Sequence, residues 1–201
     1  MINISTGSNT IHRYDYALDN DVCDKIYDYA LKCRVHACGN TLPWLESNSF
    51  RWEDLSDLNL KKHIFDYRCL VNSLVNKLYE LDLYPEYTDI VYWSNGKSMQ
   101  RHRDDGYSSI PNLSGVRIIS SVTYINDNYL GGETYIKTEH GYDYVSKPKK
   151  GTVVIFKSDD TNVHGVNTIT HGDRVTLPIW FCTNKKLSED LKLESKIKDL
   201  K

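Results

Sequence analysis

The sequence predicts a mainly β fold with helices near its N-terminus. From residue 88 onward, short runs rich in β-branched and aromatic residues are separated by Gly, Asn, Asp and Pro, as is typical of a β-sandwich or barrel. Before residue 82, apolar residues recur at helical spacing in two segments. A length of 201 residues is sufficient for one domain with a sizeable core.

The N-terminal part is expected to contain one strand and two helices. Residues 11–17 are predicted to form a short strand, and the segment 19–21 (Asp-Asn-Asp) offers caps for a helix over residues 21–33. A second helix, which would support the sheet, is expected over residues 58–81. The apolar faces predicted for the two helices comprise Val22, Ile26, Tyr29 and Ala30, and then Leu60, Ile64, Cys69, Leu70, Leu74, Val75 and Leu78.

Residues 35–56, between the two helices, show no clear period and are punctuated by Gly, Pro and Ser. Trp44 and Trp52 lie in this segment and could either cover the core or line a substrate cleft. The core role is favoured because large aromatic side chains are mostly buried.

The second half of the chain is expected to be strands up to a charged tail. The predicted strands are Ile90–Trp93, Val116–Tyr124, Thr134–Lys137, Tyr142–Val145, Thr152–Phe156 and Arg174–Cys182. Residues 184–201 are rich in Lys and Glu and are interpreted as a solvated helix whose charges lie at the surface.

Composition narrows the possible functions. The formal net charge of -2 gives no indication of a nucleic-acid footprint or of a polybasic membrane patch. The five Cys are odd in number and form no CxxC pair, which favours reduced thiols in a cytoplasmic setting. Cys23, Cys33, Cys69 and Cys182 are expected to pack as small apolar groups. The N-terminus has no apolar signal region and no window is apolar enough for a membrane span.

A candidate metal site lies around His102 and Asp104. Two residues apart on an extended segment, the imidazole and carboxylate point the same way and can share one cation. His164 supplies a third ligand if the fold brings it alongside, and two His with one carboxylate favour non-haem Fe(II). Arg174, ten residues further on, suits bidentate binding of a carboxylate such as that of 2-oxoglutarate. A rival pattern, His171-Gly172-Asp173, is interpreted as a turn.

The order of motifs resembles the prolyl 4-hydroxylase-like branch of the Fe(II)- and 2-oxoglutarate-dependent dioxygenases. The resemblance covers about residues 85–184, and the ordered series is more specific than any single motif. The matching residues are Tyr92, His102-Arg103-Asp104, Tyr124-Ile125-Asn126, Gly131-Gly132-Glu133-Thr134, Lys150-Gly151, His164, and Gly172-Asp173-Arg174 followed by Trp180.

The resemblance implies a double-stranded β-helix core of the jelly-roll, cupin-like type. One dioxygenase domain would then span residues 1–184, with helical support over about 19–81, a β-helix core over about 85–184 and a charged tail over 185–201. The cofactors implied are Fe(II), 2-oxoglutarate and O2, with L-ascorbate as an open addition.

The resemblance also assigns roles to individual residues. His102, Asp104 and His164 would bind the metal, and Arg174 with Tyr92 would bind 2-oxoglutarate. Many family members place this Tyr where the present chain has Trp93, and only one of the two neighbours can face the pocket because a strand alternates its faces. Candidates for the pocket wall are Tyr124, Thr134, Val166 and Trp180, with ordinary core packing as the alternative.

The substrate implied by the resemblance is a peptidyl proline, so a protein or peptide partner is expected. A free amino acid or another protein side chain is the alternative, and a non-catalytic binding module on the same fold is a third possibility. The loop 105–115 begins next to a metal ligand, so Tyr107 and Ile110 are expected to contact the substrate.

Overall fold

The computed structural model describes residues 1–33, 48–105 and 117–200. Trp44 lies outside them, so its expected core role is not assigned. Within the described part of the chain, no helix combines the length and the apolar character that a membrane crossing requires.

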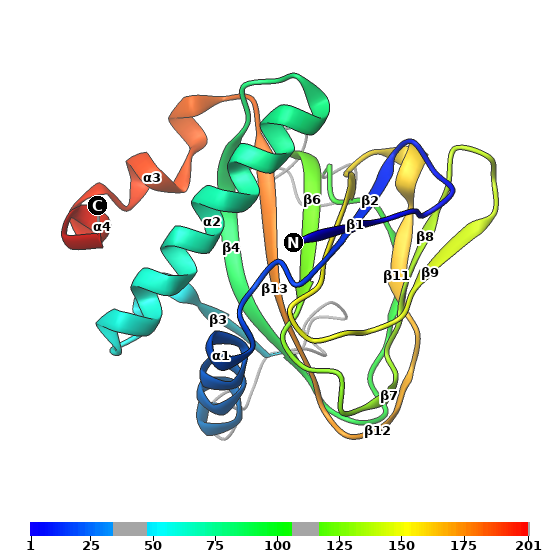
Figure 1. Ribbon diagram of the computed structural model, residues 1–201, viewed down its shortest axis with the longest axis horizontal. Helices are drawn as coiled ribbons and strands as arrows, with labels where there is room; N and C mark the ends of the chain where they lie inside the picture. The colour runs from blue at the N-terminus through cyan, green and yellow to red at the C-terminus, as the bar shows by residue number, and fades with distance from the viewer. Residues whose placement is uncertain (34–47, 106–116, 201) are drawn as a thin grey trace.

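Two antiparallel sheets face each other and form the centre of the molecule (Figure 1). In spatial order, the large sheet contains β1 (Ile2–Ile4), β2 (Ile11–Asp15), β10 (Val153–Lys157), β6 (Arg117–Tyr124), β13 (Arg174–Cys182), β4 (Tyr84–Trp93) and β3 (Asn48–Arg51). The small sheet contains β5 (Met99–His102), β11 (His164–Val166), β8 (Thr134–Lys137) and β9 (Asp143–Ser146). A separate pair joins β7 (Leu130–Gly131) to β12 (Ile169–His171).

The mainly β prediction is confirmed, and the predicted strands are all present; their ends shift by at most two residues except in β4. The largest shift is in β4, which begins at Tyr84 rather than at Ile90. The sequence did not predict β5 and β11 as strands, because each is only three or four residues long and contains a polar metal-ligand candidate.

The helices α1 (Asn20–Cys33) and α2 (Leu58–Tyr79) cover one face of the large sheet (Figure 1). The Asp57 carboxylate caps α2 by accepting hydrogen bonds from the backbone N–H groups of Asn59 and Leu60, at 2.9 and 3.0 Å. Such a cap satisfies donors that have no partner within the first helical turn.

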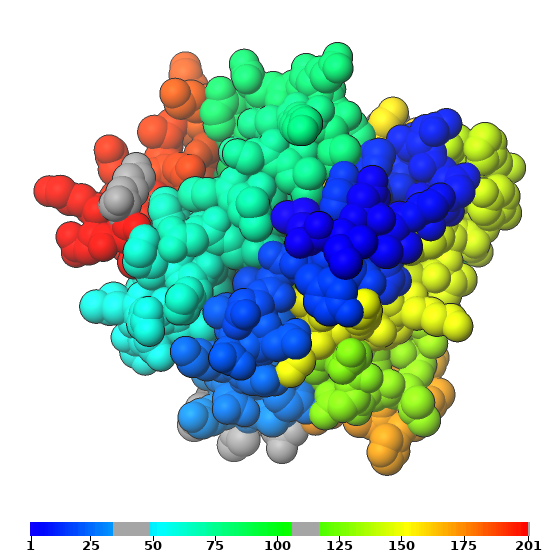
Figure 2. Space-filling view, in the orientation of Figure 1, coloured from blue at the N-terminus to red at the C-terminus, as the bar shows by residue number. Residues whose placement is uncertain are grey.

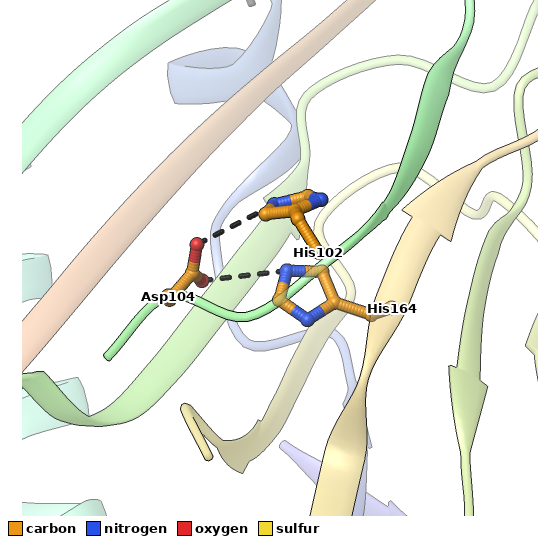
Figure 3. A group of neighbouring side chains, drawn as sticks. All are labelled: His102, Asp104 and His164. Atoms are coloured by element: carbon orange, nitrogen blue, oxygen red, sulfur yellow. Dashed lines mark ion pairs between the residues drawn. The ribbon is translucent and has the colours of Figure 1, made fainter. Parts of the chain in front are cut away.

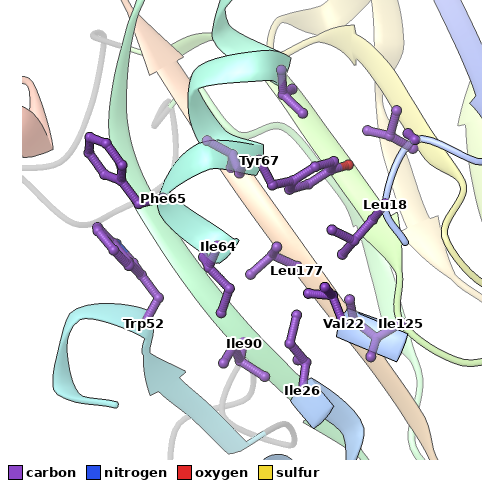
Figure 4. Packing of buried hydrophobic residues seen from close by; sticks show 14 of the residues in the cluster. Leu18, Val22, Ile26, Trp52, Ile64, Phe65, Tyr67, Ile90, Ile125 and Leu177 are labelled. Atoms are coloured by element: carbon purple, nitrogen blue, oxygen red, sulfur yellow. The ribbon is translucent and has the colours of Figure 1, made fainter. Parts of the chain in front are cut away.

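The main hydrophobic core lies between these helices and the sheet (Figure 4). Ile26 from α1 and Ile64 from α2 meet Ile90 and Leu177 from the strands, and all four are fully buried or nearly so. Trp52, in the 3₁₀ turn η3 (Trp52–Asp54), is completely buried beside Phe65, so the core interpretation of Trp52 is confirmed. Burial of each large apolar side chain contributes about 1.5–3 kcal/mol.

The apolar face predicted for α2 was wrong in part. Leu60, Ile64 and Val75 are buried, whereas Leu70 is 46% exposed and Cys69 is exposed. From Ile64, the helical period leads to positions near 67, 68 and 71, so residues 69 and 70 turn toward solvent. The buried position is instead taken by Arg68, which is 1% exposed.

The interpretation of the C-terminal tail as a solvated helix was wrong in part: most of its charged residues are exposed, as predicted, but the tail forms several short helical segments and Glu189 is buried. Its segments are η5 (Lys185–Leu187), α3 (Glu189–Lys192), α4 (Glu194–Ile197) and η6 (Lys198–Leu200). Figure 2 shows this segment, coloured orange to red, packed against α2. Glu189 is only 2% exposed, and its carboxylate accepts from the side chains of Arg51 and Trp52 and from the backbone and hydroxyl of Thr88.

The two faces of the large sheet carry different residues. Along β13, Val175, Leu177 and Ile179 point to the helices and belong to the main core. Arg174 and Thr176 alternate with them and therefore point toward the small sheet. A last turn element, η4 (Asp160–Asn162), leads from β10 to β11.

Candidate metal and cosubstrate site

The candidate metal ligands come together between the two sheets (Figure 3). His102 ends β5 and His164 begins β11, and the two are direct partners in the small sheet with ring centroids 4.3 Å apart. Asp104 follows β5 and places its Oδ1 3.5 Å from His102 Nε2 and its Oδ2 3.4 Å from His164 Nε2. One ligand atom from each residue lies within 4.8 Å of the others, so a single cation can contact all three.

Backbone carbonyls orient both imidazoles. Nδ1 of His102 lies 3.0 Å from the Gln100 carbonyl oxygen, and Nδ1 of His164 lies 3.1 Å from that of Asn162. A carbonyl only accepts, so Nδ1 carries the proton in each ring and donates it. The lone pair of Nε2 is thereby left to face Asp104, which is the arrangement that metal-binding His residues use.

The three groups also influence one another's protonation. Burial favours the neutral form of Asp104, but His164 and His102 outweigh burial and hold the pKa of Asp104 well below its usual value. Burial disfavours the charged form of His102, yet the hydrogen bond and charge of Asp104 raise the pKa of His102 above 6.5. Asp104 is therefore an anion in the folded protein, and a divalent cation between the three groups would favour the same charged form.

Arg174 lies in a buried polar pocket deeper between the sheets. Its Nη2 donates to Thr134 Oγ1 at 3.1 Å, and the Tyr124 hydroxyl donates to the same oxygen at 2.9 Å. Val166 pairs with Thr134 in the adjacent strand. All four residues are at least 92% buried, so three of the residues predicted for the pocket wall do lie with Arg174.

Tyr129 belongs to the same pocket and was missed by the sequence interpretation. Its hydroxyl and the Arg174 Nε are buried, and neither makes a hydrogen bond with the described residues. Burial raises the pKa of Tyr129 while Arg174 acts in the opposite direction, which places the two groups close together. A Cβ on Gly132 would stand 3.0 Å from the Tyr129 ring and 3.2 Å from Arg174 Cδ, so Gly132 lets both approach. The unpaired Nε of the Arg174 guanidinium and the Tyr129 hydroxyl beside it suit a carboxylate ligand.

The structure corrects the expectation for Tyr92. Tyr92 pairs with Val175 and belongs to the core on the helix side of the sheet. Trp93 pairs directly with Arg174 and packs with Ile169, so it is Trp93 that faces the Arg174 pocket. The physical reason is the alternation of side chains along β4, which allows only one of the two neighbours to point inward.

Trp180 lies on the inward face but away from the Arg174 pocket. It is the direct partner of Ser120 on β6, and its ring packs against Tyr87 at 5.9 Å with the Arg117 guanidinium 4.6 Å from the ring centre. Tyr107 and Ile110 lie outside the described residues, so their expected substrate contacts are not assigned.

The rival His171-Gly172-Asp173 pattern forms the turn between β12 and β13, as predicted. Gly172 has a φ of +76°, which glycine adopts without strain, and a Cβ there would stand 3.0 Å from the Asn128 carbonyl oxygen. Its residues are not part of the cluster formed by His102, Asp104 and His164.

Comparison with known proteins agrees with this site. Residues 88–182 match the family model described as 2OG-Fe(II) oxygenase superfamily, and this segment contains all three candidate ligands and Arg174. This match supports the resemblance to the prolyl 4-hydroxylase-like branch of that superfamily.

The curated relatives include two prolyl 3-hydroxylases. Prolyl 3-hydroxylase 2 of Homo sapiens is 40% identical over 68 residues, which cover 32% of this chain and 10% of that protein. Prolyl 3-hydroxylase 1 of Rattus norvegicus is 34% identical over 76 residues, which cover 36% of this chain and 10% of that protein. The matched segments therefore span about a tenth of the length of these relatives.

Solved structures show the fold. A Pseudomonas putida prolyl-4-hydroxylase is similar with a TM-score of 0.66 and 17% identity, covering 87% of this chain and 93% of that one. A prolyl hydroxylase from Trichoplax adhaerens, in complex with a hypoxia inducible factor peptide fragment, has a TM-score of 0.71 and 15% identity, covering 90% and 87%. These neighbours are 2-oxoglutarate oxygenases with a double-stranded β-helix, and the two facing sheets of the present chain have this architecture.

Proposed function

We propose that the protein is an Fe(II)- and 2-oxoglutarate-dependent dioxygenase that hydroxylates a C–H bond of a peptidyl proline. The observation that carries this proposal is the placement of two sites in one space between the sheets. One is the His102, Asp104 and His164 cluster, and the other is the buried pocket of Arg174.

The residues present fit both groups. Two neutral imidazoles and one carboxylate are the donor set that favours non-haem Fe(II) and leaves positions open for further ligands. The unpaired Nε of Arg174 and the unpaired hydroxyl of Tyr129 provide donors for the far carboxylate of 2-oxoglutarate. When bound, the iron with 2-oxoglutarate and O2 supplies the oxidising chemistry, and 2-oxoglutarate leaves as succinate and CO2.

The protein contributes binding, orientation and exclusion of water. Asp104 and the two imidazoles fix the position of the cation, while Arg174 and Thr134 fix the distal end of the cosubstrate. Ser120, which contacts Asp104, and Tyr124, which contacts Thr134, are four residues apart on β6 and thus about 13 Å apart along the strand. The metal cluster and the Arg174 pocket therefore adjoin two different positions on the inward face of the same strand. The buried apolar groups around them keep bulk water out.

A peptidyl proline is the favoured substrate because the relatives named above are prolyl hydroxylases and one was solved with a peptide. Trp180 and Tyr87 pack together beside Ser120, which contacts Asp104, so this aromatic pair adjoins the metal cluster.

The test is a screen of proline-containing peptides and free amino acids with Fe(II), 2-oxoglutarate and O2, with and without L-ascorbate. Succinate release and a mass gain of one oxygen are followed together, and fragmentation of the product locates the hydroxyl group. We expect a hydroxyproline-containing peptide. Hydroxylation of only a free amino acid would replace the peptide assignment, and absence of succinate with every substrate would contradict the enzyme assignment.

A further inference from the structure

Two buried serines form a hydrogen-bond chain that ends at the Asp104 carboxylate. Ser120, on β6, has its Oγ 2.7 Å from Asp104 Oδ2, and Ser158, just after β10, has its Oγ 2.8 Å from that of Ser120. Ser120 is 1% exposed and Ser158 is completely buried. Neither residue is one of the three candidate ligands.

The direction of this hydrogen-bond chain follows from the charge of Asp104. An ionised carboxylate only accepts hydrogen bonds, so the Ser120 hydroxyl must donate to Asp104. A hydroxyl has one proton, so Ser158 must donate to the oxygen of Ser120. The chain therefore runs from Ser158 through Ser120 to Oδ2, and each donor strengthens the next.

Ser158 also holds the backbone of the same segment. Its carbonyl oxygen accepts from the N–H groups of Asp104 and Asp105, both at 3.0 Å, and its own N–H donates to the Ile118 carbonyl at 2.9 Å. The segment after β5 is thus tied to β10 and β6 at the residue that carries the carboxylate. The backbone contacts set the position of Asp104, and the hydroxyl chain sets the rotation of its carboxylate.

We propose that Ser120 is a positioning residue for the metal site, acting through Asp104 and relayed by Ser158. The proposal rests on the proposed function in that a cation must bind at His102, Asp104 and His164. Without the Ser120 hydroxyl, Oδ2 loses this donor, and the carboxylate is free to rotate away from the orientation in which it faces both imidazoles. Loss of such an outer hydrogen bond lowers metal affinity by about 10- to 100-fold.

The residue after Ser120 on β6, Ser121, provides a matched control. Ser121 is also 1% exposed and also donates one hydrogen bond, to the Ile179 carbonyl oxygen at 3.2 Å. It points to the opposite face of β6 from Ser120 because consecutive residues of a strand alternate. Ser120→Ala and Ser121→Ala therefore remove the same group from the same strand, but only the first loses a contact to the metal cluster.

The experiment is a titration of the full-length protein with Co(II), in which binding is followed by the visible absorption of the bound metal. The proteins compared are wild type, Ser120→Ala, Ser121→Ala, Ser158→Ala, the double variant Ser120→Ala/Ser158→Ala, and Asp104→Ala. Thermal unfolding is measured in parallel. We expect Ser120→Ala to bind at least about tenfold more weakly. We expect Ser121→Ala to bind as wild type, and the double variant to bind no more weakly than Ser120→Ala alone.

The possible outcomes separate the two proposals. If Ser120→Ala binds Co(II) as tightly as wild type while Asp104→Ala does not bind, the positioning role is wrong and the metal site stands. If Ser120→Ala and Ser121→Ala weaken binding equally, the effect is structural and the role of Ser120 is rejected. If wild type and Asp104→Ala bind alike, the metal site itself is wrong.

Discussion

The helix-covered face and the inward face of the large sheet are built from the same strands but differ in chemistry. On β13, the residues that point to the helices are the apolar Val175, Leu177 and Ile179. The residues that point inward include Arg174 and Thr176, and β6 adds Ser120 beside the metal cluster. The two-residue period of a strand lets one face supply stability while the other face supplies binding groups. Substitutions on the two faces should therefore have separable effects.

The largest effect is expected for Asp104→Ala on the inward face. Removal of the anionic ligand should abolish 2-oxoglutarate turnover, whereas the fold should be retained because Asp104 is not part of the main hydrophobic core between the helices and the sheet. Succinate release and thermal unfolding measure the two properties. Asp173→Ala, from the rival turn, should leave metal binding intact; full turnover in Asp104→Ala would show that the assignment is wrong.

The next effect concerns the buried charge of Glu189, which lies in the C-terminal segment and not at the metal site. Glu189→Ala should lower the free energy of unfolding by about 3–5 kcal/mol, because it leaves the buried Arg68 and the partly buried Arg51 without this carboxylate. Urea denaturation measures the change. Glu194→Ala, in the exposed part of the same tail, should shift stability by less than about 0.5 kcal/mol. Similar small shifts in both variants would restore the interpretation of the tail as a solvated surface segment.

Leu177→Ala tests the apolar face directly. Leu177 is completely buried between the helices and the sheet, so the smaller side chain should cost about 2–5 kcal/mol of stability. Co(II) affinity per folded molecule should be unchanged, because the neighbouring inward residues keep their contacts. A loss of metal affinity as large as the loss of stability would mean that the two faces are not separable.

The last effect is a pH dependence at the β3 edge of the sheet. Burial, opposed by Arg51 but assisted by Glu189 and Glu53, raises the pKa of Asp89 from 3.8 to about 7. The folded state then holds this proton more tightly than the unfolded state, so its stabilising contribution is lost as pH rises from 3.8 toward 7. Urea denaturation at several pH values should show this decline in wild type and a flatter profile in Asp89→Asn. Identical profiles would exclude titration of Asp89 in this range.

Local patterns predicted much of the fold. The two helices and the main strands follow from apolar periods that extend over many residues. Which face of each element is buried was harder to predict, as Cys69 and Leu70 show. A helix of 22 residues allows more than one apolar stripe. The same limit explains Tyr92, since adjacent aromatic residues on β4 give no indication of which one faces inward.

Parts of the site could not be predicted because they depend on contacts distant in sequence. Asp104 and Ser120 are 16 residues apart, and Ser120 and Ser158 are 38 apart. Glu189 reaches Arg51 across 138 residues. A serine in a strand or a glutamate in a charged tail has no local signal for such a partner, whereas His102 and Asp104 are neighbours whose residue types already indicate a metal.

The most direct test is an anaerobic titration of the wild-type protein with Fe(II) and 2-oxoglutarate, followed by visible absorption. Because both ligands are proposed to occupy the inward face together, a weak charge-transfer band should appear only when both are present. Arg174→Ala should require about a hundredfold more 2-oxoglutarate for the same band, because a charge-assisted contact in a buried pocket is lost, while its iron affinity is unchanged. A folded wild-type protein that shows no band at saturating iron and 2-oxoglutarate, or an Arg174→Ala variant with the wild-type titration curve, would contradict the account.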